Sequence, residues 1–197
     1  MCIRDRYYGC ITALDAQVGR LRALLRELEV ERDTIVWFGS DNGPEGRAGR
    51  APGSAGSLRG RKRDLFEGGI RVPGIVEWPA AIEAGRTSDV PTVTHDLVPT
   101  LAPLFGAAAP GDLDGVDLGP LLRGAPFERG ESIEFLYKQR SALIDGRYKV
   151  VSVDSGETWS LFDLGDDPFE SVDLASQQPE RTAGLVGAFE AWRKGLE

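Results

Sequence analysis

Asp41 and Asn42 are residues whose types and position could bind a metal ion. They come just after a short apolar run, residues 34–38, which is typical of a strand covered on both faces, as in a parallel sheet. Ligands of open α/β sheets bind beyond the carboxyl ends of the strands. A carboxylate beside an amide oxygen suits Ca²⁺ or Mg²⁺ and suits Zn²⁺ poorly. Asp-Asn-Gly is also a common turn sequence, so a plain turn is the other interpretation of this spacing.

A basic loop comes after this turn. Residues 45–71 contain seven cations and three anions, a local charge of +4 in a chain whose net charge is −8. We expect this loop to bind an anion. Lys62 is the candidate ligand, because a lysine ammonium is a compact donor suited to an oxyanion. A solvated basic run is the alternative interpretation. Farther along the loop, Gly68 and Gly69 would allow two stretches of backbone to approach closely.

The composition excludes several other classes of function. With 23 basic and 31 acidic residues, the chain has no global electrostatic reason to bind nucleic acid. Two cysteines, Cys2 and Cys10, cannot form a disulfide framework or a four-cysteine zinc site. One histidine, His95, excludes zinc sites that need two histidines from this chain. No apolar run is long enough to span a bilayer, so we expect no membrane segment.

The elements that must position the turn and the loop begin with a helix. Apolar residues at steps of three and four predict a helix over residues 7–29, with Cys10 in its core. The apolar runs 34–38 and 72–78 predict two strands. A helix followed by a buried strand indicates an α/β protein.

A second helix is predicted over residues 95–105 by the spacing of its leucines. Asp96 is the expected N-cap, which would put Pro99 in the first turn, where a missing N–H costs little. His95 is expected to have a structural role near the start of this helix.

The remaining third of the chain has a different pattern. Residues 103–130 are rich in proline and glycine, which predicts a long irregular connection and a domain boundary. Four short runs rich in aromatic and aliphatic residues predict an antiparallel sheet, with a hairpin at Asp145-Gly146 between the second and third. Helical spacing returns from residue 179 to about 194. The four predicted strands are residues 132–137, 141–144, 148–153 and 159–162.

Several ordered motifs together make the sequence resemble the type I sulfatases, the formylglycine-dependent, arylsulfatase-like family of the alkaline phosphatase superfamily. The resemblance covers nearly everything after residue 6, and the joint agreement is far more specific than any one motif. The motifs are Tyr7-Tyr8 with Leu14-Asp15-x-x-Val18-Gly19, Ser40-Asp41-Asn42-Gly43-Pro44, Leu58-Arg59-Gly60-x-Lys62-x-x-x-x-Glu67-Gly68-Gly69-Ile70-Arg71-Val72-Pro73, Asp96-Leu97-Val98-Pro99-Thr100-Leu101, Leu113-Asp114-Gly115-Val116-Asp117-Leu118 and Leu161-Phe162-Asp163-Leu164-x-x-Asp167-Pro168-x-Glu170.

The resemblance implies an α/β fold. It would be the C-terminal part of an alkaline-phosphatase-like sandwich with a mixed, mostly parallel sheet, followed by a small antiparallel four-stranded sheet with a C-terminal helix. It also implies that Asp41 and Asn42 are ligands of a calcium ion, with Mg²⁺ as the alternative, and that Lys62 holds a sulfate oxygen of the substrate. Asp41 would also orient or deprotonate the nucleophile. The implied substrate is a sulfated small molecule or a sulfated glycan.

Departures from the family pattern predict that the chain is a C-terminal fragment. The family's formylglycine nucleophile arises from a Cys-x-Pro/Ala-Ser-Arg-like motif far upstream, and Cys2-Ile3-Arg4-Asp5-Arg6 does not match it. We therefore expect the chain alone to be inactive and to lack the N-terminal half of its own domain. The expected divisions are a non-native start at 1–6, part of a catalytic domain at 7–130, and a small sheet-and-helix subdomain at 131–197.

Two other functions remain as alternatives at this stage. One is a phosphodiesterase or phosphatase of the same superfamily, but such enzymes generally use two metals with histidine ligands. The single histidine, and Asn42 where a histidine would be expected, argue against that function. The other is a non-catalytic binding module built from the C-terminal sheet and helix.

Overall fold

The computed structural model describes residues 3–47, 49–108, 111 and 113–196. No helix within these residues is both long enough and apolar enough to cross a membrane. The helices and strands, in chain order, are α1 (Ile3–Glu27), η1 (Glu31–Asp33), β1 (Val36–Gly39), α2 (Glu67–Ile70), β2 (Gly74–Glu77), η2 (Thr94–Asp96), α3 (Leu97–Leu104), α4 (Gly119–Leu122), β3 (Ile133–Tyr137), β4 (Arg140–Asp145), β5 (Tyr148–Ser152), β6 (Ser160–Asp163) and α5 (Pro179–Lys194).

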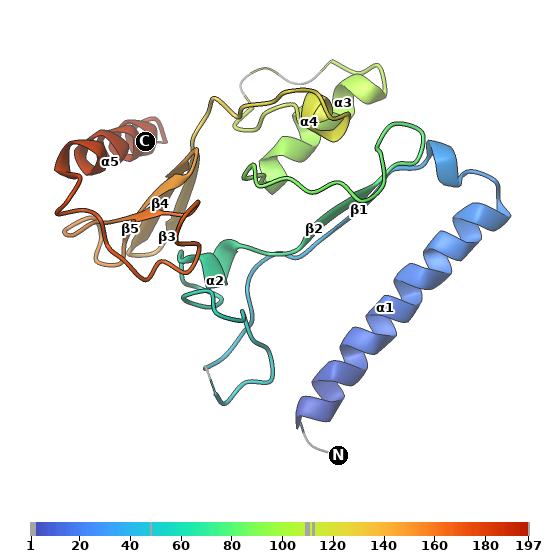
Figure 1. The fold of residues 1–197 in the computed structure, drawn as a ribbon, viewed down its shortest axis with the longest axis horizontal. Helices are drawn as coiled ribbons and strands as arrows, with labels where there is room; N and C mark the ends of the chain where they lie inside the picture. The colour runs from blue at the N-terminus through green and yellow to red at the C-terminus, as the bar shows by residue number, and fades with distance from the viewer. Residues whose placement is uncertain (1–2, 48, 109–110, 112, 197) are drawn as a thin grey trace.

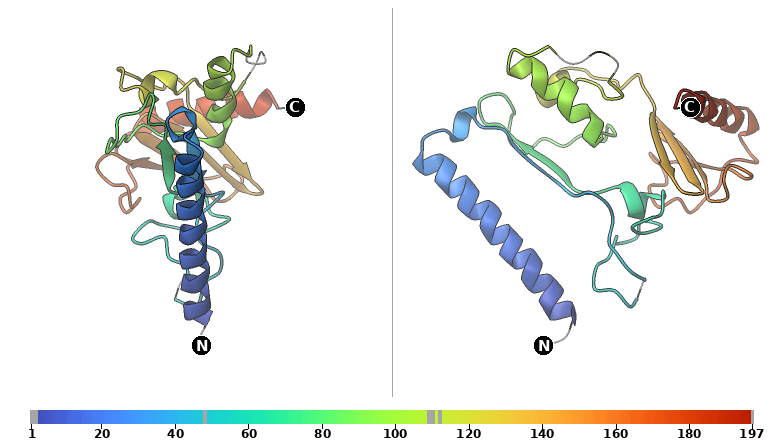
Figure 2. Two further views of the ribbon diagram at one scale, coloured as in Figure 1. Left: turned by 90° about the vertical axis from the view of Figure 1, so that its right-hand side faces the viewer. Right: turned by 180° about the vertical axis from the view of Figure 1, so that it is seen from behind.

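Helix α1 lies at one end of the molecule and the C-terminal sheet with α5 at the other (Figures 1 and 2). The helix begins at Ile3, four residues before the predicted start, and none of its described side chains is buried. Its apolar side borders a groove of about 860 Å³, whose other wall comes largely from β1, β2 and the segment after β2. The prediction that Cys10 lies in a helix core is wrong, because its side chain is exposed. Cys2 lies outside the described residues.

Strands β1 and β2 pair antiparallel, with a register that runs from Val36 opposite Glu77 to Gly39 opposite Gly74. The strand at residues 34–38 is therefore not parallel to β2, and an antiparallel pair of this kind is compatible with the mixed sheet expected for the family. Val36, Trp37 and Phe38 are only partly buried. An apolar run indicates that a strand is buried, but it does not determine whether the neighbouring strand runs parallel or antiparallel to it.

Asp96 is buried and precedes α3, but it does not act as the predicted side-chain N-cap. Its carboxylate instead accepts hydrogen bonds from the N–H groups of Val93 and Val116, at 2.8 and 2.9 Å. Arg129 binds both of its oxygens, at 2.7 and 2.9 Å. Asp96 thus ties three separate segments together. Pro99 occupies the first turn of α3, as predicted.

The C-terminal sheet has the order β3-β4-β5-β6, and every neighbouring pair is antiparallel. This confirms the predicted four-stranded sheet, and α5 confirms the predicted C-terminal helix. The β4–β5 hairpin turns at Gly146, whose φ of 55° lies in the left-handed region that favours glycine.

Each face of this sheet is covered by a different segment of the chain. On one face, Leu143, Val150 and Leu161 pack against Leu185 and Phe189 of α5. The other face packs against the α2 segment through a second cluster of Leu65, Ala142, Val151 and Phe162, with Phe66 and Ile70 at its border. Figure 1 shows α2 beside the sheet, on the side away from α5. The sheet therefore supports the segment that contains the basic loop.

Candidate functional site

Hydrogen bonds between residues close in sequence build the turn after β1, at residues 40–43. Asp41 Oδ1 accepts from the Asn42 N–H at 3.0 Å, and Asn42 Nδ2 donates to the Gly43 carbonyl at 2.9 Å. Ser40 Oγ donates to the Asn42 carbonyl at 3.3 Å. These are local hydrogen bonds between side chains and the backbone of residues one or two positions away. They leave Asp41 Oδ2 and Asn42 Oδ1 without a protein partner among the described residues.

Two backbone hydrogen bonds join this turn to the basic loop. The Gly43 N–H donates to the Gly69 carbonyl at 2.8 Å, and the Lys62 N–H donates to the Pro44 carbonyl at 3.2 Å. Residues 41–44 and 62–69, separated in sequence, are thereby fixed side by side. The predicted site residues Asp41, Asn42 and Lys62 all lie on these two joined segments.

The side chain of Lys62 is held less firmly than that of its neighbour Arg63. Arg63 Nη1 lies 2.6 Å from Glu45 Oε1, whereas Lys62 Nζ lies 3.9 Å from Glu45 Oε2. The hydrogen bond from Arg63, helped by the Gly46 N–H, lowers the pKa of the Glu45 carboxyl. The Lys62 ammonium, with 35% of its side chain exposed, keeps most of its donor capacity for another anion.

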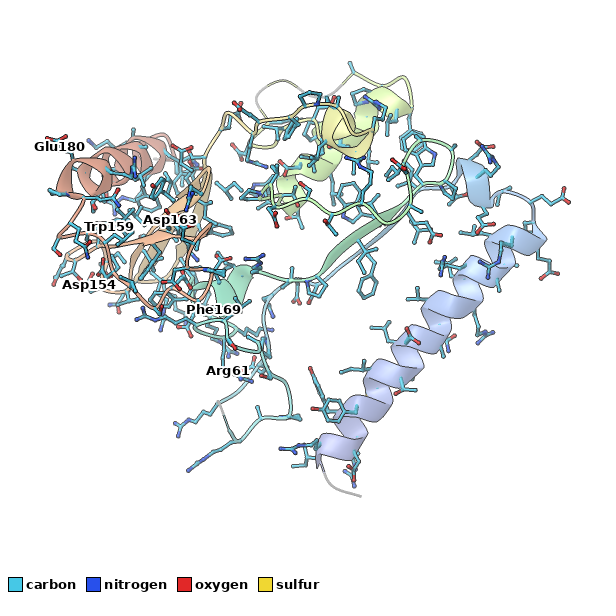
Figure 3. The ribbon with its side chains drawn as sticks, viewed as in Figure 1. Arg61, Asp154, Trp159, Asp163, Phe169 and Glu180 are labelled. Carbon is cyan, nitrogen blue, oxygen red and sulfur yellow. The ribbon has the colours of Figure 1, made fainter. Side chains whose placement is uncertain are left out.

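Arg61, labelled in Figure 3, joins two positions of the basic loop, residues 45 and 53. Its Nη2 donates to the carbonyl of Glu45 at 3.0 Å and to that of Gly53 at 2.7 Å. Of the three consecutive cations, Arg61 and Arg63 are therefore bound within the loop. The Lys62 side chain has, among the residues that the structure describes, only its long contact with Glu45.

Gly68 and Gly69 lie where the turn and the basic loop converge. A Cβ atom on Gly68 would stand 2.6 Å from the Arg59 carbonyl oxygen, and one on Gly69 would stand 2.6 Å from that of Arg61. Carbon and oxygen atoms do not approach so closely without a shift of the backbone. The predicted close approach at this glycine pair is confirmed.

Glu67 belongs to a buried ionic cluster that sequence reasoning missed. The ammonium of Lys149, on β5, lies 2.8 Å from Glu67 Oε1 and 2.9 Å from Glu170 Oε1. Glu170 Oε2 accepts from the Glu67 N–H at 2.6 Å. Burial raises the pKa of Glu170, although Lys149 opposes this shift. A lysine at an inward position of an otherwise apolar strand is the sequence signal that could have indicated such a cluster.

The other candidates are not part of this arrangement. His95 is exposed on η2. Within the described ranges, no group of three or more His, Cys, Asp and Glu side chains could hold a metal ion. Asp41 and Asn42 could therefore supply only part of a calcium shell, which needs six to eight oxygens in all.

Two family models match the chain. The model described as Sulfatase matches residues 3–107, and the model described as N-sulphoglucosamine sulphohydrolase, C-terminal, matches residues 60–185. Together they include the turn, the basic loop and most of the C-terminal sheet and helix.

Curated relatives and solved structures agree with these matches. The steryl-sulfatase of Mus musculus is 43% identical over 149 residues, which cover 72% of this chain and 24% of that protein. The arylsulfatase A of Bos taurus is 34% identical over 205 residues, covering 90% of this chain and 40% of that protein. A crystal structure of Ps i-CgsB in complex with k-i-k-neocarrahexaose is 28% identical, with a TM-score of 0.85, and the match covers 96% of this chain and 43% of that one. The chain thus spans less than half the length of each.

Proposed function

Because the chain belongs to the sulfatase family, we propose that the polypeptide carrying it hydrolyses sulfate esters and that residues 40–71 supply part of the active site. One observation carries this proposal. The backbone bonds Gly43–Gly69 and Lys62–Pro44 hold a turn rich in oxygen ligands against a loop rich in cations. A site that binds a metal ion and a sulfate group needs both kinds of segment next to each other.

Asp41 and Asn42 would hold the metal, with Ca²⁺ as the proposed ion and Mg²⁺ as the alternative. Their carboxylate and amide oxygens fit a hard cation, and the turn geometry leaves one oxygen of each side chain without a protein partner among the described residues. When bound, such an ion neutralises negative charge on a sulfuryl group. The remaining ligands would come from other parts of the polypeptide.

Lys62 would bind a sulfuryl oxygen of the substrate. Its ammonium is not tightly bound by Glu45, so it can turn to an anion at little cost. The ammonium would stabilise the charge that develops on the sulfuryl oxygens during the reaction. Asp41 would additionally orient the nucleophile or take its proton.

The formylglycine nucleophile is proposed to come from another part of the polypeptide. Cys10 is exposed on α1, and the sequence around Cys2 does not match the maturation motif. We therefore expect no turnover of an aryl sulfate by this chain alone. Substitution of Cys2 or Cys10 by alanine should leave the activity of the whole polypeptide unchanged.

The proposed substrate is a sulfate ester of a small molecule or of a glycan. The similar proteins include one named steryl-sulfatase and one crystallised with k-i-k-neocarrahexaose. The phosphatase and binding-module alternatives have less support, because the relatives named here are sulfatases and the single histidine is exposed on η2.

Calcium titration of the whole polypeptide tests the proposal. Asp41→Ala should weaken Ca²⁺ binding by about tenfold or more and abolish turnover of an aryl sulfate. The matched control is Asp33→Ala, an exposed carboxylate at the opposite end of β1, which should change neither quantity. Turnover of an aryl phosphate without turnover of the sulfate would favour the phosphatase alternative. Equal Ca²⁺ affinity in Asp41→Ala and the unsubstituted protein would contradict the assigned ligand.

A further inference from the structure

The cluster of Lys149, Glu67 and Glu170 is buried deeply enough to require a reason for its retention. The side chains of Lys149 and Glu170 have no exposed surface, and that of Glu67 is 5% exposed. Charges removed from water this completely carry a large desolvation cost, and apolar residues of similar volume often stabilise a fold at least as well. We therefore expect these three residues to have a role beyond stability.

The cluster joins the C-terminal sheet to α2. Lys149 lies on β5 and faces the α2 side, as does its neighbour Val151, two residues further along. Glu67 is the first residue of α2, and Glu170 lies in the segment after β6. The partners are 82 residues apart for Lys149 and Glu67, and 103 for Glu67 and Glu170. Three distant parts of the chain thus meet at one ammonium.

Further contacts fix Glu170 in this place. Its backbone has a φ of 56°, which is uncommon for a residue other than glycine and persists only where the surroundings determine it. Arg59 Nη1 donates to the Glu170 carbonyl at 3.2 Å. The Arg59 guanidinium also stacks over the Phe66 ring, 3.9 Å from its centroid. Glu170 is therefore held from the basic loop as well as from the sheet.

The cluster holds the backbone on which the candidate site rests. Glu170 Oε2 fixes the Glu67 N–H, and the next two residues, Gly68 and Gly69, contact both the turn and the loop. The Gly68 N–H donates to the Arg59 carbonyl at 2.6 Å, and the Gly69 carbonyl accepts from Gly43. A short path of contacts runs from Lys149 through Glu67 to the glycine pair, and from there to the turn that contains Asp41 and Asn42.

We propose that Lys149, Glu67 and Glu170 are positioning residues, which fix the Gly68-Gly69 backbone from the C-terminal sheet and thereby set the relative placement of the Asp41-Asn42 turn and the Lys62 loop. The consequence for catalysis rests on the proposed function. The mechanical part, control of residues 40–44 by a lysine on β5, does not. The C-terminal sheet is then a support for the active site, although it supplies none of the proposed ligands.

Amide hydrogen exchange in the whole polypeptide tests the mechanical part. Lys149→Met removes the ammonium and keeps much of the apolar stem. The matched control is Val150→Ala, the next residue on β5, whose side chain faces α5. Exchange at the amides of residues 40–43 and 67–70 should be about tenfold or more faster in Lys149→Met than in Val150→Ala, when each variant is measured under conditions that give both the same global stability.

A milder variant keeps the test decisive if Lys149→Met does not fold. Glu170→Gln retains an oxygen that can accept from the Glu67 N–H but loses one ion pair to Lys149. It should accelerate exchange in the same two segments and weaken Ca²⁺ binding by about tenfold, the scale seen for groups that support metal ligands. Val150→Ala should leave Ca²⁺ affinity unchanged.

The outcomes separate this inference from the proposed function. Suppose that exchange at residues 40–43 is faster in the Lys149 and Glu170 variants than in Val150→Ala, but that the unsubstituted polypeptide has no sulfatase turnover. This result would support the positioning role and refute the proposed function. If Glu170→Gln and Val150→Ala give the same exchange pattern at equal stability, the cluster is only a structural ion pair and the inference is wrong.

Discussion

The α-carbon of Gly43 packs so closely against the carbonyl group of Gly68 that a Cβ atom on Gly43 would overlap the Gly68 carbonyl oxygen. This contact is next to the hydrogen bond from the Gly43 N–H to Gly69. The turn with the proposed metal ligands and the segment that carries Glu67 are therefore packed backbone to backbone. Any side chain at position 43 must push them apart.

We expect Gly43→Ala to lower the free energy of unfolding of the whole polypeptide by about 3 kcal/mol, because the backbone must shift to admit the methyl group. Calcium affinity should fall with it. Gly39→Ala is the matched control, since a Cβ on Gly39 would lie an ordinary 3.6 Å from its nearest atom, the Pro73 carbonyl oxygen. Urea unfolding and calcium titration measure the two effects. Equal stability of the two variants would contradict the close packing.

Lys62→Ala should reduce kcat/KM of the whole polypeptide by about 10²-fold, the size typical of removing one positioned donor at a developing charge. Arg63→Ala should do much less, because Arg63 is occupied by Glu45 at 2.6 Å. Steady-state kinetics with an aryl sulfate would measure both. Small and equal effects would mean that Lys62 does not bind the sulfuryl group.

The turn between β5 and β6 should make the free energy of unfolding depend on pH in strong acid. Asp154, labelled in Figure 3, accepts from the Thr158 hydroxyl at 2.5 Å, the Thr158 N–H at 3.0 Å and the Ser152 hydroxyl at 2.7 Å. These bonds, those from Thr158 first, lower the pKa of Asp154 from its ordinary 3.8 to about 2. A lowered carboxyl pKa stabilises the fold above pH 4, and this contribution is lost as the pH falls from about 4 to about 2.

Asp154→Asn should remove that part of the pH dependence. The unsubstituted protein should lose more stability between pH 4 and pH 2 than the variant, as followed by urea midpoints at each pH. An NMR titration of the Asp154 carboxyl should give a midpoint near pH 2. A midpoint near 3.8 would show that the turn does not favour the ionised form.

The purified chain by itself should self-associate through α1. Ile11, Leu14 and Leu21 of this helix are 48%, 53% and 46% exposed, and they lie on its apolar side. An exposed apolar surface of this kind favours association. Leu14→Glu combined with Leu21→Glu should shift the chain toward monomer in size-exclusion chromatography with light scattering. Ala23→Glu, on the opposite side of the helix, should not. A monodisperse unsubstituted monomer would contradict this expectation.

Local patterns were sufficient to predict the C-terminal sheet and α5. The hairpin at Asp145-Gly146 and the leucine and aromatic spacing of α5 depend on residues close in sequence, and both elements are found where expected. The antiparallel pairing of β1 was not predictable. The direction of its partner, β2, depends on the path of the chain between the two strands, and the apolar residues of β1 carry no information about that path.

The partners of the buried charged residues also could not be predicted from local sequence. Asp96 has the residue type and position of an N-cap, but Arg129, 33 residues away, engages its carboxylate instead. Glu67 and Lys149 are 82 residues apart, so a lysine in an apolar strand can indicate a buried charge but does not identify its partner. Asp41, Asn42 and Lys62 were singled out by motif, and their roles as ligands stay predictions that the experiments above address.

The connectivity of the C-terminal sheet has a consequence for the order of folding. Each of its strands pairs with the next strand in sequence, so its contacts close only short loops. The pairing of β1 with β2 and the contact of Glu67 with Lys149 close much longer ones. Since short loops close at lower entropic cost, β4 and β5 should acquire protected amides before Gly43 does, which pulsed hydrogen exchange during refolding can measure. The ammonium of Lys149 then stays hydrated until α2 docks, and the dehydration of that charge becomes a late event in folding.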